Sequence, residues 1–291
     1  MKETHIALAH GNGGRYMREL IDELFATRLA NPLLDTGLDA VGIPDLPDGE
    51  LVVTTDGFTV HPLEFPGGNI GSLAVHGSIN DLAVSGALPK YLTLNAFIEE
   101  GTEIALLQRL VDAMAQAARD SKVSVIAGDT KVVRRGEADG VYFATTGFGV
   151  RPRDLRLGMQ HIQSGDQVLV SGAVGNHGAA VLLAREEFGF HGELKSDAAS
   201  VLEAAQALCR IPSLRFMRDP TRGGLATVAN ELARGTGLCL RLQEDRIPVR
   251  EPVQSVCELL GYDPLYLACE GRIVAVMAKE SARQALAALR S

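Results

Sequence analysis

The stretch that decides the fold lies at residues 123–131 and reads Val123-Ser124-Val125-Ile126-Ala127-Gly128-Asp129-Thr130-Lys131. Its β-branched residues favour an extended strand, and the glycine that follows lets the backbone approach a ligand closely. Polar residues at strand ends commonly line clefts. The sequence therefore predicts a strand that ends at Gly128-Asp129, with Asp129 and Lys131 at the edge of a cleft.

Two further aspartates lie in similar segments. Asp56 follows the apolar run Leu51-Val52-Val53-Thr54-Thr55, and Asp81 follows Asn80 in a stretch, Ile70 to Ser85, that has the apolar pattern of a helix. Mg²⁺ prefers carboxylate oxygens, and a polyphosphate needs its charge offset by metal and by an ammonium group. The three aspartates with Lys131 therefore predict a magnesium and nucleotide-phosphate site. Taken alone, each aspartate is better explained as a turn or helix-cap residue, and only the three together with Lys131 favour the site.

A glycine-rich segment near the N-terminus is a third candidate for phosphate binding. His10-Gly11-Asn12-Gly13-Gly14 precedes a helical pattern that runs from about Arg15 to Leu29. The first turn of a helix presents free N–H groups to anions, so Gly11, Gly13 and Gly14 fit a phosphate-binding loop. A plain turn is the alternative. The chain contains no GxxxxGK[ST] sequence and no GxGxxG order, which excludes a P-loop and a dinucleotide fingerprint.

Composition restricts the class of protein. The net charge of −8, the aromatic content of 5% and the absence of long Lys/Arg runs predict no nucleic-acid partner. No apolar stretch approaches the length of about 18 residues that spans a membrane, and Met1 opens no signal-peptide pattern. The 4 cysteines have no CxxC spacing, which predicts no disulfide framework and no zinc site. We expect a cytoplasmic protein that does not bind membranes.

The order of predicted elements indicates an α/β (α+β) protein of two domains, 1–150 and 151–291, with a boundary at Arg151-Pro152-Arg153. A surface loop is expected over 35–49 and an irregular functional loop over 62–68, and His76 is expected to be a packed core histidine. The remaining predicted strands are 51–55, 91–98, 123–129, 141–150, 167–171, 238–242 and 272–277. The remaining predicted helices are 102–120, 179–188, 198–208, 225–234, 252–260 and 281–289.

Several of these strings occur in the order found in one known family. They are Leu8 to Gly14, Thr55 to Gly57, Phe65 to Gly71, Asn80 to Ala87, Gly128 to Val133 and Arg218 to Gly224. Through them the whole chain resembles the HypE family of hydrogenase maturation factors, in the superfamily of aminoimidazole-ribonucleotide synthetase and selenophosphate synthetase. The resemblance implies a two-domain PurM-like fold whose N-terminal domain pairs with its copy in a homodimer.

The resemblance also implies a reaction and its participants. ATP would bind in a cleft lined by both domains, with Mg²⁺ held by Asp56, Asp81 and Asp129. Asn80 lies beside Asp81, Lys131 would neutralise phosphate charge, and the loop from His10 to Gly14 would close over the nucleotide. The family dehydrates a carbamoyl group on a C-terminal cysteine to a thiocyanate, which supplies cyanide ligands for the [NiFe] centre. The implied partners are a carbamoyltransferase maturation protein and a cyanide-accepting scaffold complex.

Removal of the amide protons needs a base, and two residues are candidates. Glu270, in Cys269-Glu270-Gly271, matches an acidic position of the family, and His10 is the second candidate. A turn carboxylate is an equal explanation for Glu270.

The chain departs from the family at its end, because the tail Pro-Arg-Ile-Cys is absent after Ser291. A truncated chain, a proteolysed core and a natural variant are all compatible with this. Cys209, Cys239 and Cys257 lie in apolar patterns that predict buried structural thiols, so none replaces the acceptor cysteine. Two other functions stay open: a synthetase or kinase that acts on a free small substrate, and a non-catalytic maturation scaffold. Against the synthetase interpretation, this chain has no cysteine near the glycine-rich loop, where selenophosphate synthetase has a reactive one. Against the scaffold interpretation, the chain retains the Asp and Lys residues.

Overall fold

The protein is described by a computed structural model, which covers residues 3–38, 40–44, 46–185 and 194–290. The chain forms two compact units. The first comprises Met1–Glu64, Gly68–Leu82 and Pro89–Val150, and the second comprises Phe65–Gly67, Ala83–Leu88 and Arg151–Ser291. Two short pieces that precede Arg151 in the sequence therefore belong to the second unit.

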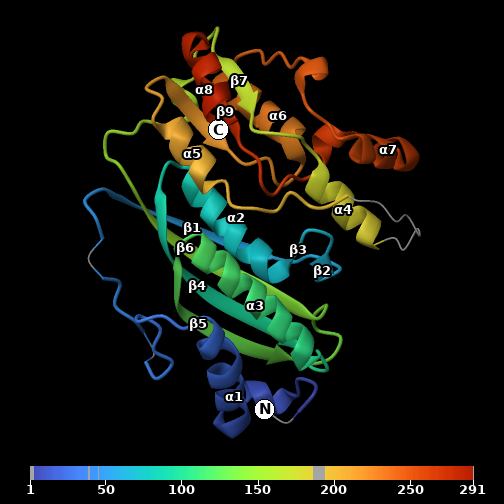
Figure 1. The fold of residues 1–291 in the computed structure, drawn as a ribbon. Coiled ribbons are helices and arrows are strands. Elements are labelled where there is room, and N and C mark those ends of the chain that lie inside the picture. The colour runs from blue at the N-terminus through green and yellow to red at the C-terminus, as the bar shows by residue number, and fades with distance from the viewer. Residues whose placement is uncertain (1–2, 39, 45, 186–193, 291) are drawn as a thin grey trace. The chain divides into compact units, whose positions relative to one another are not determined.

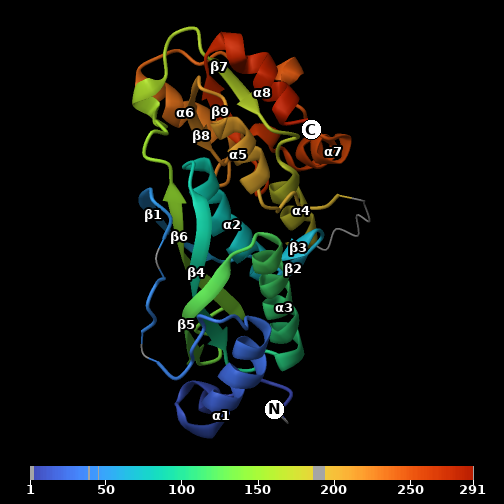
Figure 2. The ribbon, with the colours of Figure 1, turned by 60° about the vertical axis from the view of Figure 1, so that its left-hand side comes forward.

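The first unit contains a four-stranded sheet with two helices on one face (Figures 1 and 2). Its strands are β1 (Glu50–Phe58), β4 (Leu88–Glu99), β5 (Ser124–Val133) and β6 (Val141–Arg151), in the order β1-β6-β4-β5. The helices are α2 (Ile70–Val84) and α3 (Ile104–Asp120). Along β4, buried Leu92, Leu94, Ala96 and Ile98 alternate with more exposed residues, as expected where only one face of a sheet is covered.

Close packing of the two helices depends on a small residue. A Cβ atom added to Gly71 of α2 would lie 1.9 Å from the carbonyl oxygen of Leu110 in α3, so only glycine fits at this contact. The expected helix over 70–85 is thus confirmed as α2, and His76 lies on it partly buried. Burial lowers the pKa of His76, in keeping with a packed histidine.

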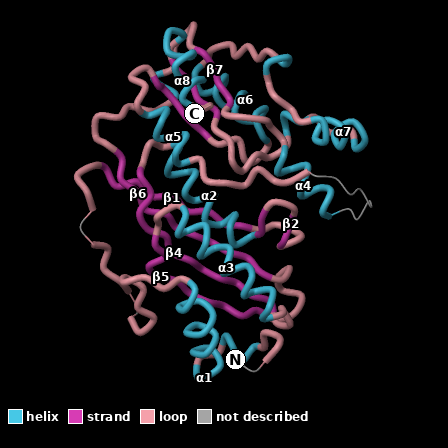
Figure 3. The backbone as a smooth tube through the Cα atoms, viewed as in Figure 1, coloured by secondary structure: helices cyan, strands magenta, loops and turns pink. Residues whose placement is uncertain are grey.

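The N-terminal segment combines three kinds of helix. A 3₁₀ turn η1 (Leu8–Gly11) is followed by α1 (Gly14–Glu19) and by a π-helix, η2 (Leu20–Ala26), which together confirm the helix expected from about residue 15. The described part of 35–49 has no helix and no strand, and Figure 3 draws it as an extended loop. The expected irregular segment 62–68 contains instead a small hairpin of β2 (Glu64–Phe65) and β3 (Gly68–Asn69).

The second unit is built on a three-stranded antiparallel sheet, β7-β9-β8. Its strands are β7 (Gln167–Val170), β8 (Leu214–Arg218) and β9 (Val274–Met277), and its α-helices are α4 (Asn176–Arg185), α5 (Leu202–Cys209), α6 (Gly224–Thr236), α7 (Glu251–Leu260) and α8 (Ala282–Ala288). Short 3₁₀ turns are η3 (Met159–His161), η4 (Glu244–Arg246), η5 (Pro264–Tyr266) and η6 (Lys279–Ser281).

The central strand β9 is buried on both faces, which explains its uninterrupted apolar sequence. Ala275 and Met277 pack in a cluster with residues of α5 and α8. Val274 and Val276 point the other way, into a cluster with Leu225 of α6 and its neighbours. The second unit is therefore a sheet with helices on both faces, and the predicted mixed α/β fold is confirmed.

Four local predictions need correction. The strand expected over 238–242 is absent, because this apolar alternation pairs with no strand among the described residues. Strand β8 was not predicted, since Arg215 and Arg218 interrupt its apolar pattern. The helix expected from Ala198 begins only at Leu202. The helix expected over 179–188 corresponds to α4, which begins three residues earlier, at Asn176; residues 186–188 lie outside the described residues.

Candidate functional site

Two of the three predicted aspartates lie on the same side of α2: Asp81 is part of this helix, and Asp56 is on the neighbouring strand β1. Thr54 of β1 donates a hydrogen bond from Oγ1 to Oδ2 of Asp81 over 2.7 Å. Two residues further along β1, Oδ2 of Asp56 lies 3.9 Å from the position that a Cβ atom on Gly77 would occupy. Gly77 and Asp81 are one turn apart on the same face of α2. The carboxylates of Asp56 and Asp81 thus lie along one side of this helix, where β1 passes it.

The third aspartate lies elsewhere in the first unit. Asp129 stands on β5, the edge strand opposite to β1, and pairs with Asn95 of β4. Thr130 is buried under the helices, whereas Asp129 and Lys131 are exposed, so both side chains project from the open face of the sheet. The structure therefore brings Asp56 and Asp81 together and leaves Asp129 at the other edge. Among the described residues no group of three or more His, Cys, Asp or Glu side chains is arranged to hold a metal.

The expected strand ends also need correction. β1 continues through Asp56 to Phe58, and β5 continues through Asp129 to Val133, so both aspartates lie inside strands. Their side chains remain accessible because both strands are at the edges of the sheet. The threonines that neighbour the two aspartates are compatible with a strand, since Thr has high β-propensity.

Asp129 and Lys131 form an exposed ion pair of modest strength. Nζ of Lys131 lies 3.4 Å from Oδ2 of Asp129, and the side chains are 62% and 54% exposed. The backbone N–H of Thr130 donates to Oδ1 of Asp129 over 2.8 Å. A pair this exposed is weakened by solvent screening, so both charges stay available to a ligand.

The glycine-rich loop lies beside the same strand. A Cβ atom on Gly11 would be 2.7 Å from Cβ of Val132, next to Lys131, so η1 runs tightly along β5. Gly13 and Gly14 have φ angles of 78° and 76°, which favour glycine, and nothing lies within 4 Å of an added Cβ. The glycine-rich loop thus lies on the same edge of the sheet as Lys131 and Asp129.

Two predicted residues are less accessible than their roles suggest. His10 is 1% exposed, its Nδ1 lies 3.0 Å from the backbone N of Ala7, and its Nε2 is buried without a hydrogen-bond partner among the described residues. Asn80 is also 1% exposed and lies in the packed part of α2. A direct role in ligand binding would require the surroundings of either side chain to move.

In the second unit, Glu270 lies among the segments that carry the remaining motifs. The N–H of Cys269 donates to the carbonyl oxygen of Pro220, in the Asp219-Pro220 turn, over 3.0 Å. The N–H of Gly175 donates to Sγ of Cys269 over 3.1 Å. The glycine-rich segments at 171–178 and 218–224 are therefore joined to the segment that bears Glu270, which is itself half-buried.

Sequence reasoning missed a buried network behind Glu270. Asp197, whose side chain is 1% exposed, accepts hydrogen bonds from the backbone N–H groups of His177 (3.1 Å) and Glu270 (3.3 Å). Nε of Arg272 lies 3.5 Å from the other carboxylate oxygen. Nδ1 of His177 lies 2.8 Å from Oγ of Ser196, and burial lowers the pKa of His177 to about 4. No sequence signal marks this aspartate, because its partners are backbone groups distant in the chain.

Of the three cysteines predicted to be buried, Cys257 is buried, Cys209 is only partly buried and Cys239 is exposed. Cys257 and Cys269 are buried, and burial raises the pKa of Cys269 to about 12 and that of Cys209 to about 11. The thiols of Cys269 and Cys209 are thus poor nucleophiles at neutral pH. Cys239 is exposed, contrary to the buried position predicted for it, because the segment around it forms no strand.

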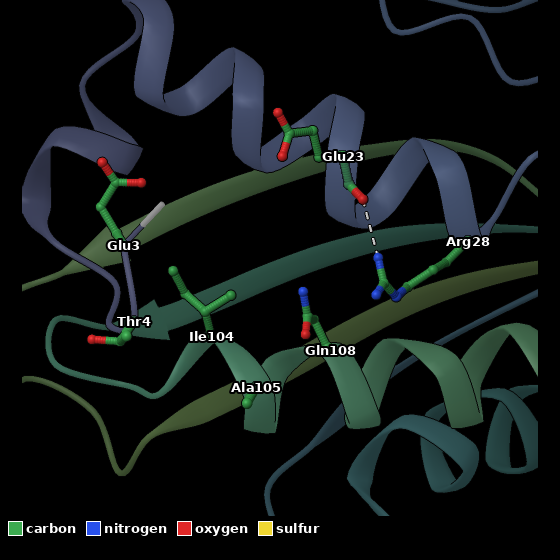
Figure 4. A pocket seen from close by; sticks show the side chains of 7 residues that line it. All are labelled: Glu3, Thr4, Glu23, Arg28, Ile104, Ala105 and Gln108. Carbon is green, nitrogen blue, oxygen red and sulfur yellow. Dashed lines mark hydrogen bonds between the residues drawn. The ribbon is translucent and has the colours of Figure 1, made fainter. Parts of the chain in front are cut away.

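A cavity near the N-terminus contains none of the predicted site residues (Figure 4). Its volume is about 300 Å³, and it is lined by Glu3, Thr4, Glu23, Arg28, Ile104, Ala105 and Gln108. Arg28 donates from Nη1 to the carbonyl oxygen of Glu23 over 3.0 Å and pairs with Asp112, so its charge is already used within the protein. We assign no ligand to this cavity. In the part of the chain that the structure describes, no helix has the length and apolar character needed to span a bilayer.

Comparison with known proteins places these features in a family. Residues 38–151 match the AIR synthase related protein N-terminal domain, and residues 163–291 match the corresponding C-terminal domain. A hydrogenase expression/formation protein HupE of Azotobacter chroococcum mcd 1 is 47% identical over 291 residues, which cover 100% of this chain and 85% of the relative. Carbamoyl dehydratase HypE of Escherichia coli (strain K12) is 44% identical, with 99% of this chain and 87% of that protein covered.

Solved structures agree with this assignment. A crystal structure of the hydrogenase maturation protein HypE in complex with ATP has a TM-score of 0.94 and 42% identity, covering 98% of this chain and 85% of that one. HypE in a HypE–HypF complex has a TM-score of 0.81 and 40% identity, covering 93% and 88%. A thiamine monophosphate kinase from Aquifex aeolicus, at 18% identity and a TM-score of 0.64, shares the fold alone.

The two matched domains and the paired units define an enzyme of the AIR synthase-related class, with the PurM-like fold. Within that class, the identities of 44–47% over the whole chain decide the assignment. The chain belongs to the HypE family of carbamoyl dehydratases, which acts in hydrogenase maturation.

Proposed function

We propose that this protein dehydrates a carbamoyl group carried on a cysteine thiol to a thiocyanate, using ATP. The overall reaction converts R–S–C(=O)NH₂ and ATP into R–S–C≡N, ADP and phosphate. The amide oxygen attacks the γ-phosphorus and ADP leaves; loss of both nitrogen protons then expels that oxygen as phosphate. The observation that carries the proposal is the pair of carboxylates, Asp56 and Asp81, along α2 in a chain whose relatives are carbamoyl dehydratases.

The residues of the first unit fit a magnesium nucleotide. Asp56 and Asp81 offer hard carboxylate oxygens along one side of α2. Mg²⁺ held by these side chains would offset negative charge on the phosphates as the γ-phosphoryl group is transferred. Lys131 supplies a positive charge at the other edge of the sheet, and the glycine-rich loop runs beside it, with Gly11 packed against Val132.

The proton acceptor in this proposal is Glu270. Its side chain is half-buried, and its backbone is held by the N–H bond to Asp197 and by the neighbouring bond from Cys269 to Pro220. A carboxylate fixed in this way has the chemistry to take the two nitrogen protons in turn. His10 is the weaker candidate, because its ring is buried and Nδ1 is already bonded to Ala7.

We further infer that the site is completed by a second copy of the chain. Asp129 and Lys131 stand at the opposite edge and on the opposite face of the sheet from Asp56 and Asp81. The open face carries exposed apolar side chains, among them Leu51, Val53 and Phe97, which are 52%, 53% and 39% exposed. Such a face favours association with another sheet. A homodimer formed through this face would set the β5 edge of one copy beside the β1 edge of the other.

Partners and location follow from the relatives. HypE has been crystallised with HypF, and we propose that this chain likewise binds a carbamoyl-transferring maturation protein. A scaffold complex that accepts cyanide is the second proposed partner, and the cytoplasm is the proposed location. These proposals rest on family membership and on the crystal structure of the HypE–HypF complex.

The function is tested by binding and by turnover. Calorimetry with Mg²⁺-ATP is expected to give binding to the wild-type chain and none to Asp129→Ala. The chain is then mixed with ATP and a synthetic peptide that ends in S-carbamoyl cysteine. Mass spectrometry is expected to detect the peptide with one water lost, and ADP in equal amount. Nucleotide binding without peptide dehydration would contradict the reaction; absence of binding to the wild type would contradict the nucleotide site as well.

A further inference from the structure

The segment that bears Glu270 is held from behind by one buried carboxylate. Oδ1 of Asp197 accepts the backbone N–H of Glu270 over 3.3 Å and that of His177, the second residue of α4, over 3.1 Å. Oδ2 lies 3.5 Å from Nε of Arg272. The side chain of Asp197 is 1% exposed, so its charge is separated from water and each of these contacts is stronger than it would be at the surface.

Arg272 extends this anchorage along the chain. Its Nε donates to the carbonyl oxygen of Ala173 over 2.9 Å, and its Nη1 donates to that of Gly271 over 2.7 Å. A guanidinium group has a rigid planar array of donors, so it fixes the relative positions of the groups that accept from it. Glu270 is therefore tied to Asp197 directly through its backbone N–H, and Gly271, the residue after it, is tied to Asp197 through Arg272.

Backbone packing at the next residue shows how close this approach is. A Cβ atom on Gly271 would lie 2.0 Å from the carbonyl oxygen of Asp197, so no other residue fits there without displacing the chain. Cys269, on the other side of Glu270, is held by its N–H bond to Pro220 and by the N–H bond that Gly175 donates to its sulfur. The residues on both sides of Glu270 are thus tightly packed, whereas Glu270 itself is half-buried.

We propose that Asp197 is a positioning residue, which sets the direction of the Glu270 side chain by holding its backbone N–H and by orienting Arg272. This inference rests on the proposed role of Glu270 as the proton acceptor. A base that is displaced by a fraction of its hydrogen-bond length loses alignment with the proton it removes, and such losses reduce turnover strongly. Asp197 itself is buried and does not touch the substrate.

The test compares Asp197→Asn with a matched control. Asp166→Asn alters a similar pair, in which Nε of Arg215 lies 2.9 Å from Oδ2 of a carboxylate that is 7% exposed, and no bond connects it to Glu270. Both variants weaken a buried Arg–Asp pair, so a purely structural effect is expected in both. Only Asp197→Asn is expected to lower kcat with the carbamoyl peptide, by about 10- to 100-fold, without a change in ATP affinity.

Coupling to Glu270 is measured directly by a double variant. Asp197→Asn combined with Glu270→Gln is expected to turn over no more slowly than Glu270→Gln alone, since a residue that acts through Glu270 has nothing left to position. If Asp197→Asn instead slows turnover by the same factor in the Glu270→Gln background as in the wild type, the two effects are independent and the proposal is overturned. If Asp197→Asn does not fold, as judged by circular dichroism, Arg272→Lys replaces it, because lysine keeps the charge and loses the planar set of donors.

Hydrogen exchange separates this inference from the proposed reaction. The N–H of Glu270 is expected to exchange about tenfold faster in Asp197→Asn than in the wild type, the effect of weakening one bond to a charged group. Asp166→Asn is expected to leave it unchanged. Unchanged exchange in Asp197→Asn would overturn the positioning role whatever the enzyme does. A wild-type chain that binds ATP yet does not dehydrate the peptide would instead contradict the proposed function, while faster exchange would still support the anchorage.

Discussion

Two chains that are each inactive are expected to form an active heterodimer. The two variants are Asp81→Ala, on the β1 side of the sheet, and Asp129→Ala, on the β5 side. The strand order β1-β6-β4-β5 separates these strands by three strand spacings. At about 4.8 Å per spacing this is about 14 Å, and the side chains also lie on opposite faces. One Mg²⁺ binds its oxygens at about 2.1 Å, so a single chain does not supply both carboxylates to it.

The size of the effect follows from symmetry. In a twofold dimer with composite sites, each site takes Asp81 from one chain and Asp129 from the other. A heterodimer of the two variants then has one site with both substitutions and one site with neither. Its activity is expected to be about half that of the wild-type dimer, while each homodimeric variant has none.

The assay uses co-expressed chains that carry different affinity tags, purified over both tags in turn so that only heterodimers remain. ATP turnover with the carbamoyl peptide is the readout. A heterodimer of wild type with Asp81→Ala is the control, because it keeps one intact site whether sites lie within or between chains. An inactive Asp81→Ala/Asp129→Ala heterodimer beside a half-active control would refute composite sites, and failure to recover any doubly tagged species would refute the dimer.

Three further predictions concern single residues. At neutral pH, iodoacetamide is expected to alkylate exposed Cys239 long before Cys269, whose pKa burial raises to about 12; mass spectrometry of tryptic peptides measures the order, and the reverse order would contradict the described burial. Burial lowers the pKa of His177 from 6.5 to about 4, so as the pH falls the unfolded chain takes up a proton before the folded chain does. The contribution of neutral His177 to the free energy of unfolding is therefore fully present above pH 6.5 and falls by about 3 kcal/mol toward pH 4. Urea unfolding of His177→Gln should show a shallower decline over this range than the wild type, and an equal decline would contradict the shift. Gly71→Ala is expected to lose about 1–3 kcal/mol or more in the free energy of unfolding, because its methyl group would meet a carbonyl oxygen of α3. Gly57→Ala is the control, since nothing lies within 4 Å of its added Cβ.

Local sequence patterns predicted the elements better than their arrangement. Helix α2 was expected over 70–85 and is observed over Ile70–Val84, because a long run of small and apolar residues has no competing structure. The apolar alternation at 238–242 looks like a strand but finds no neighbour to pair with in the described structure. Strand formation depends on a partner that lies elsewhere in the chain, so its local pattern is less decisive.

The candidate site was predicted residue by residue but not as a geometry. The motifs marked Asp56, Asp81 and Asp129, and nothing in their spacing states that β6 and β4 lie between β1 and β5. Which edge a strand occupies is set by pairing over the whole domain. The anchorage of Glu270 by Asp197 could not be predicted for the same reason, since this hydrogen bond joins two residues that lie more than seventy positions apart in the chain.

Glycines near the aspartates show that a motif can carry two unrelated requirements. The sequence interpretation assigned Gly128 to close ligand approach, yet a Cβ atom on Gly128 would lie 2.6 Å from the carbonyl oxygen of Leu94. Gly77, which carried no sequence prediction, is similar, because a Cβ atom there would lie 2.6 Å from the ring of Phe58. These two glycines are required by packing within the protein, so loss of activity on substituting them would say little about ligand binding. Gly13 and Gly14 have open space around them and positive φ angles. Alanine there perturbs the loop and leaves the core intact, which makes these two positions the informative ones for a phosphate-binding role.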